Sequence, residues 1–109
     1  MKVRLAVSAG ARLRGLNALA GSDVLLLAPC RDIHTVGMAR PIDIAFLDAK
    51  GSVVRAERGV PPGTRRRCSG AVAVLERYEA AEAWFDAGDE VDIGIAGGFA
   101  VGNECARGN

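Results

Sequence analysis

The feature that most constrains the fold is a pair of apolar segments joined by a tight turn. Residues 41–47 alternate so that three large apolar side chains fall on one face of a β-strand, whereas Asp43 falls on the other face. Residues 48–51 are typical of a turn, and Gly51 suits the left-handed backbone conformation that such turns favour. The run over 52–56 then predicts the partner strand of a β-hairpin.

The same criteria predict further strands, each bounded by glycine, proline or other turn residues. These strands cover residues 2–8, 24–28, 71–76 and 90–95. Apolar residues at spacings of three and four also predict two short helices. The helices cover residues 11–20 and 79–85, and the segments 30–40 and 58–66 are expected to be irregular.

This order of elements predicts a mainly β fold. Two short helices cannot cover both faces of a doubly wound parallel sheet. We therefore expect an antiparallel sandwich or squat barrel, jelly-roll-like, with one or two short helices. A length of 109 residues allows one domain. We assign residues 1–95 to this β-rich domain and expect a loosely held C-terminal tail over 96–109, where glycines recur.

Charge and apolar pattern exclude several classes of protein. No run of about 18 apolar residues occurs, so no membrane span is predicted. The formal net charge of +1 disfavours nucleic acid as a partner. Three cysteines without a CxxC pair argue against a secreted disulfide scaffold, and the N-terminal apolar run is too short for a signal peptide. We therefore expect a cytoplasmic protein with reduced thiols.

The candidate site is the segment 30–38. It contains the single histidine of the chain and one of the three cysteines, and it precedes the strand that carries Asp43. Loops held on a rigid sheet are where binding residues tend to lie. The candidate binding residues are Cys30, Arg31, His34, Thr35, Met38, Asp43 and Cys68.

The residues over 30–51 follow the pattern CRxIHTxGMxxPIDxxFLDxxG. On this pattern the chain resembles the bacterial and archaeal "domain of unknown function 192" family, over about residues 4–93. Shorter matches are Arg14-Gly15-Leu16, Pro61-Pro62, Cys68-x-Gly70-Ala71, Val74-Leu75-Glu76 and Gly88-Asp89. The resemblance implies a compact β-rich domain, similar to a distorted sandwich or jelly roll, and it implies no activity. One branch of the family differs over 33–38, so the cysteine and histidine here are not required by the fold.

Structural zinc is one alternative for this segment. Cys30, His34 and Cys68 could supply two thiolates and an imidazole, with Asp43 or Cys105 as a fourth ligand. Structural zinc sites usually have four ligands in two closely spaced pairs, and here the second pair is incomplete. The leading interpretation therefore includes no metal and no cofactor.

A thiol-dependent enzyme is the other alternative, with Cys30 or Cys68 as nucleophile and His34 as its partner. A neighbouring imidazolium would lower the pKa of the thiol and so increase the thiolate fraction. If the segment is extended, however, the four residues from Cys30 to His34 span about 13 Å, too far for a hydrogen bond. The two cysteines could also form a disulfide or simply be small buried residues. His34 could equally hold a loop carbonyl, with Thr35 assisting.

Two charged features leave structural alternatives open. A buried Asp43 must be paired or protonated, and Arg31, Arg40 or Arg55 could be its partner. The run 65–67 is three consecutive arginines, which could bind phosphate or form a solvated face.

The sequence therefore favours a non-catalytic binding module. Its ligand would be a small polar or anionic molecule or a protein partner, bound at the 30–38 loop with Asp43 beneath it.

Overall fold

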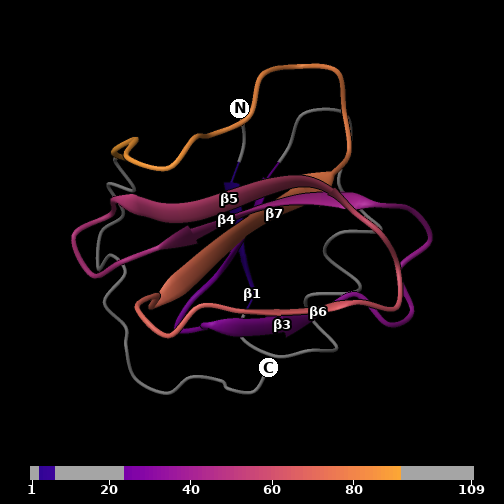
Figure 1. The fold of residues 1–109 in the computed structure, drawn as a ribbon, viewed down its shortest axis with the longest axis horizontal. Helices are drawn as coiled ribbons and strands as arrows, with labels where there is room; N and C mark the ends of the chain where they lie inside the picture. Colours follow the sequence, from indigo (N-terminus) through magenta and orange to yellow (C-terminus); the bar gives the residue numbers. More distant parts are fainter. Residues whose placement is uncertain (1–2, 7–23, 92–109) are drawn as a thin grey trace.

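A computed structural model describes residues 3–6 and 24–91 and shows two β-sheets (Figure 1). The larger sheet has five strands in the order β1-β2-β7-β4-β5. The strands are β1 (Val3–Ala6), β2 (Val24–Leu27), β4 (Ile42–Leu47), β5 (Val53–Val60) and β7 (Ala73–Tyr78). The edge strand β1 is parallel to β2, and the other neighbours are antiparallel.

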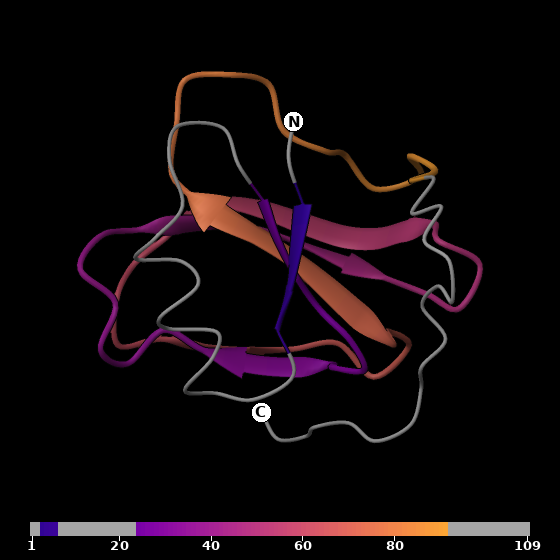
Figure 2. The same ribbon diagram turned by 180° about the vertical axis from the view of Figure 1, so that it is seen from behind.

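The smaller sheet is a two-stranded antiparallel ribbon, formed by β3 (Asp32–His34) and β6 (Arg65–Arg67). It covers one face of the large sheet, and residues 79–91, which we call the strap, cross the opposite face (Figures 1 and 2). This layered arrangement confirms the predicted sandwich-like β fold.

The strands β2, β4 and β7 of the large sheet are buried on both faces, and the described part of the chain has two apolar clusters. The ribbon-side cluster comprises Leu25, Leu27, Cys30, Ile33, Met38, Ile42, Ile44, Phe46, Val60, Ala71 and Val74. The strap-side cluster comprises Val24, Leu26, Ala28, Ala45, Leu47, Val53, Ala73 and Leu75, and Trp84, Phe85 and Val91 of the strap pack against it. All six residues of β4 are buried and divide between the two faces as the alternation of 41–47 predicts.

The predicted hairpin forms between β4 and β5, although β5 extends to Val60 rather than ending at residue 56. The Asp48 carboxylate accepts hydrogen bonds from the backbone amides of Lys50 and Ser52, at 2.9 and 3.0 Å. Gly51 adopts a φ of 87°, which an L side chain tolerates poorly. The carboxylate and the glycine together define the turn.

The prediction of a helix over 79–85 is wrong, since the strap contains no helix. The physical reason is that its carbonyl groups bond to arginine side chains rather than to amides one turn ahead. Arg77 donates to the carbonyls of Glu82 and Ala83, at 2.6 and 3.2 Å, and Arg58 donates to that of Glu82 at 3.0 Å. The Ala80 carbonyl also accepts from Arg58, whereas a helix over 79–85 would use that carbonyl for the amide of Trp84.

Two segments expected to be irregular are partly strand. β3 lies within 30–40, and the segment 58–66 contains the end of β5 and the start of β6, leaving a short turn at 61–64. Each strand of the ribbon forms because the other supplies its hydrogen bonds, a pairing across 33 positions that local periodicity does not reveal.

Several predictions lie wholly or partly outside the described residues. These are the helix over 11–20, the end of the strand over 90–95 and the tail over 96–109. Within 24–91, only Glu90 of the predicted last strand is paired, in an isolated bridge to Ser52. In the described part of the chain, no helix is long and apolar enough to cross a membrane.

Candidate functional site

Three predicted site residues belong to the core between the sheet and the ribbon. Cys30 and Met38 are buried in the ribbon-side cluster, and Cys68, partly buried, packs against it. The Cys30 thiol donates a long hydrogen bond to the Asp32 carbonyl at 3.4 Å, and no disulfide joins the two cysteines. Their local role in the described structure is packing.

Thr35 is fully buried and joins the two strands at one end of the ribbon. Its hydroxyl donates to the carbonyl of Pro61 at 2.7 Å and accepts from the amide of Thr64 at 2.8 Å. Its backbone amide donates to the Thr64 carbonyl, and its carbonyl accepts from the amides of Met38 and Gly63. Thr35 therefore holds the turn after β3 against the turn before β6.

The outer face of the ribbon is polar and exposed. In the register of β3 and β6, Asp32 lies opposite Arg67 and His34 lies opposite Arg65. The intervening pair, Ile33 and Arg66, points the other way, and Ile33 enters the core. We call Asp32, His34, Arg65 and Arg67 the outer ribbon face. The exposed Arg31 immediately precedes it.

One ion pair organises the outer ribbon face. Arg65 donates from Nε to Asp32 Oδ1 at 2.9 Å and from Nη2 to Oδ2. This hydrogen bond is the main reason that the pKa of Asp32 lies below its usual value, and it raises the pKa of Arg65. Neither Arg31 nor Arg67 has an ion-pair partner among the residues of the described part of the chain. Their charges remain available on the surface.

The ribbon is attached to the large sheet by a second charged group. Arg66 donates from Nε to the Glu57 carboxylate at 2.9 and 3.1 Å, and Arg55 donates to the same carboxylate at 2.7 Å. Burial raises the pKa of Glu57, but the two arginines outweigh it, so the pKa lies below its usual value. Arg55 also donates to the Arg67 carbonyl at 3.2 Å. These contacts fix β6 over β5.

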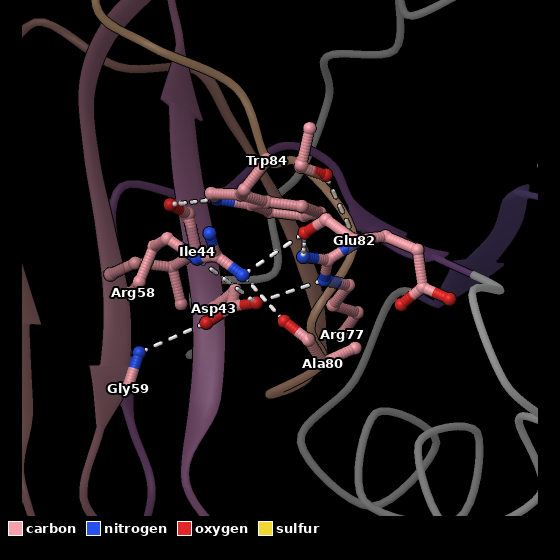
Figure 3. A network of polar contacts seen from close by, with 9 residues as sticks. Asp43, Ile44, Arg58, Gly59, Arg77, Ala80, Glu82 and Trp84 are labelled. Atoms are coloured by element: carbon pink, nitrogen blue, oxygen red, sulfur yellow. Dashed lines mark hydrogen bonds and ion pairs between the residues drawn. The ribbon is translucent and has the colours of Figure 1, made fainter.

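Asp43 lies on the opposite face of the sheet from the cysteines, beneath the strap (Figure 3). It is fully buried, and Arg77, opposite it on β7, donates from Nε to Oδ2 at 2.9 Å. The amide of Gly59 donates to Oδ1 at 2.9 Å. The structure thus corrects the partners proposed from the sequence, Arg31, Arg40 and Arg55, because cross-strand register rather than sequence proximity brings Arg77 to this carboxylate.

The Asp43 network extends into the strap through Trp84. The Trp84 indole lies over the Arg77 guanidinium, whose carbon is 4.6 Å from the ring centroid. The indole nitrogen donates to the Ile44 carbonyl at 2.8 Å (Figure 3). Arg58 lies nearby, 3.9 Å from Asp43. Arg77 and Trp84 were not predicted as site residues; the signal present in the sequence is the only tryptophan of the chain, seven residues after an arginine.

The predicted site residues therefore divide among four places: the ribbon-side core, the buried Thr35 at one end of the ribbon, the outer ribbon face with Arg31 beside it, and the network beneath the strap. Ile33 enters the core and His34 lies on the exposed opposite side of β3, so the buried Cys30 and the imidazole are not brought together. Across residues 24–91, no three His, Cys, Asp or Glu side chains gather as a metal site would require. What the described surface offers chemically is a set of cationic hydrogen-bond donors on a rigid ribbon.

The fold and the outer ribbon face define a small β-sandwich domain with a charged surface ribbon. The chain belongs to the DUF192 family, described as "Uncharacterized ACR", whose model matches residues 1–93. None of the curated proteins compared with the chain matches it.

Two solved structures have a similar fold. One is a protein of unknown function from Novosphingobium aromaticivorans, at 20% identity and a TM-score of 0.58, with 72% of this chain and 63% of that chain covered. The other is a "putative transcription regulator" from Sinorhizobium meliloti, at 21% identity and a TM-score of 0.57, with 71% of this chain and 67% of that chain covered. At these identities the likeness concerns the fold alone.

Proposed function

We propose that this domain is a non-catalytic binding module whose outer ribbon face, with Arg31 beside it, binds an anionic partner. The observation that carries the proposal is the pair of exposed arginines, Arg31 and Arg67, that have no ion-pair partner among the described residues. A guanidinium donates two parallel hydrogen bonds to a carboxylate or phosphate. The exposed His34 adds a third donor within the same face.

Rigidity of the ribbon supports the proposal. The Thr35 hydroxyl holds its two turns together, and the Arg66–Glu57 pair fixes β6 to β5. Asp32 holds the Arg65 side chain in place. A preorganised surface loses little conformational entropy on binding, so a few charge-assisted contacts suffice for affinity.

Separation of the thiol from the imidazole favours binding over catalysis. A nucleophilic cysteine needs a base or a cationic group at hydrogen-bond distance. Here the Cys30 thiol donates to a backbone carbonyl in the core, whereas His34 is on the outer face. We place the domain in the cytoplasm, where its cysteines stay reduced, and infer a small anionic molecule or an acidic protein segment as the ligand.

Titration with two probes tests the proposal. Tripolyphosphate represents a small anion, and a peptide of alternating glutamate and serine represents an acidic protein segment. We expect one of them to shift the amide resonances of β3 and β6, and Arg67→Gln or Arg31→Gln to weaken its binding by about threefold to tenfold.

Lys50→Gln is the matched control, because it removes the same charge from the β4–β5 turn instead of the ribbon. This variant should retain wild-type affinity. Absence of ribbon shifts with both probes, or equal weakening by Lys50→Gln and Arg67→Gln, would overturn the proposal.

A further inference from the structure

The strap differs in charge from the ribbon on the other side of the sheet. Residues 79–90 contain five carboxylates and neither lysine nor arginine, and all five carboxylate residues are exposed. These residues are Glu79, Glu82, Asp86, Asp89 and Glu90. A partner of this surface should therefore be cationic, the opposite of the partner proposed for the ribbon.

A cleft of about 340 Å³ opens between the strap and strand β5. One wall is formed by residues 56–58 of β5, and the other by residues 83–87 of the strap. Trp84 and Phe85 contribute aromatic rings, which pack edge to face with centroids 4.9 Å apart. The other apolar lining residues, Ala56, Ala83 and Ala87, have small side chains that do not fill the cleft. Its lining of aromatic rings, small side chains and polar groups suits a short stretch of extended chain.

Strand β5 is the last strand of the sheet, so its outer edge has no neighbouring strand in the described structure. The strap pairs with this edge only at its beginning. The Val53 amide donates to Asp89 and the Val53 carbonyl accepts from Gly88, both at 2.8 Å. In the described part of the chain, no backbone hydrogen bond runs from the strap to residues 54–58. An open edge beside a cleft is where an extended peptide can add as a further strand.

The charged side chains of the cleft are not equally available. Arg58 is engaged with strap carbonyls, and Glu57 is engaged with Arg55 and Arg66. The Asp86 carboxylate has no hydrogen-bond or ion-pair partner among residues 24–91, because only its backbone groups contact Asp89. Asp86 is thus the available charge at the rim of the cleft.

We propose that the cleft between β5 and the strap binds an extended peptide segment carrying a basic side chain. The peptide backbone pairs with the outer edge of β5 near residues 56–58, and the basic group faces Asp86. This interaction uses the edge of β5 and the strap rather than the outer ribbon face, so it goes beyond the anion-binding function.

The probe is a capped peptide of alternating valine and lysine, compared with a second peptide in which glutamate replaces lysine. We expect the lysine peptide, at millimolar concentration, to shift the amide resonances of residues 55–58 and 84–87. The glutamate peptide should not. A lysine peptide with N-methylated backbone amides should also fail to bind, because it cannot donate to β5.

Two strap variants distinguish a local site from diffuse attraction. Asp86→Asn should weaken binding of the lysine peptide by about threefold to tenfold, whereas Glu82→Gln, the same charge change outside the cleft lining, should leave it within about twofold. Ala87→Trp, which fills the cleft, should abolish binding.

Three results would overturn the proposal: no shifts at 55–58 and 84–87, an equal response to the glutamate peptide, or equal weakening by the two charge variants. Undiminished binding of the N-methylated peptide would overturn strand addition to β5.

Discussion

The ribbon and the strap cover the two faces of one sheet by different physical means. The ribbon satisfies its backbone with its own ladder between β3 and β6 and inserts Ile33 into the core. The strap has no ladder along most of its length, and its carbonyls accept hydrogen bonds from arginine side chains. The difference shows that buried backbone polar groups can be satisfied by strands or by side chains, but the second solution concentrates stability in a few residues.

The largest expected effect is that of removing Arg77. Arg77→Met leaves the buried Asp43 carboxylate without its principal partner, the Ala83 carbonyl without its donor and the Glu82 carbonyl with Arg58 alone. Breaking one side of a buried ion pair costs about 3–5 kcal/mol. Urea denaturation should show this loss in the free energy of unfolding.

Arg67→Met is the control from the ribbon. Arg67 is exposed and has no ion-pair partner in the described structure, so its loss should cost less than about 0.5 kcal/mol. Similar unfolding midpoints for the two variants would show that the strap does not depend on its arginine.

A smaller loss of stability is expected from removing the Thr35 hydroxyl, which bonds to backbone groups at the ribbon as Arg77 does at the strap. Thr35→Val keeps the shape of the side chain but leaves the Thr64 amide without its acceptor and the Pro61 carbonyl without a donor. An unsatisfied buried polar group costs about 1–3 kcal/mol. Thermal denaturation measures the loss, and Thr64→Val is the control, since no hydrogen bond of its own hydroxyl supports the ribbon. Equal stability of the two variants would contradict the role given to Thr35.

Substituting two glycines compares the contact of the β4–β5 turn with the strap and the turn that precedes β6 in the ribbon. Gly51 and Gly63 both have positive φ, at 87° and 76°, so alanine is strained at either position. A Cβ at Gly51 would also lie 2.8 Å from the carbonyl oxygen of Val91 in the strap, whereas nothing lies within 4 Å at Gly63. Gly51→Ala should therefore cost roughly 1 kcal/mol more than Gly63→Ala in chemical denaturation. If both substitutions destabilise the protein equally, the strap backbone at Val91 moves away from the added Cβ without a cost in free energy.

The smallest effect concerns the ion pair between Asp32 and Arg65, which is largely exposed. Because the pKa of Asp32 is lowered from 3.8, the pair stabilises the folded state above that pH and loses its contribution as the pH falls through the lowered value. Arg65→Gln should therefore lower the free energy of unfolding near pH 7, and this deficit should shrink near pH 2. Unfolding free energies at the two pH values, repeated in about 1 M salt to screen the pair, test this sign. A deficit that persists at low pH would assign another role to Arg65.

Local features of the fold were predictable from the sequence, and pairings between distant segments were not. The division of β4 into two buried faces follows from alternation within seven residues. The partner of Asp43 depends on the register between β4 and β7, which places it opposite a residue 34 positions later. The strap had apolar spacings typical of a helix, yet the arginines that bind its carbonyls favour an irregular path.

The candidate site was only partly predictable for the same reason. The sequence predicts an irregular loop over 30–38, in which any set of side chains could converge. Once Asp32–His34 is a strand, Ile33 must point inward and His34 outward, which removes the imidazole from the buried Cys30. The three arginines at 65–67 divide similarly, because Arg66 turns inward to Glu57 and the other two stay outside.

The opposite charges of ribbon and strap also give the described part of the molecule an electric dipole. Three consecutive arginines lie on one side of the sheet and five carboxylates on the other, although the formal net charge is only +1. A dipolar particle experiences a torque near any charged surface and presents a particular side to it. Such a molecule is expected to be retained by both cation and anion exchangers near neutral pH, and to orient before it makes contact with either kind of partner.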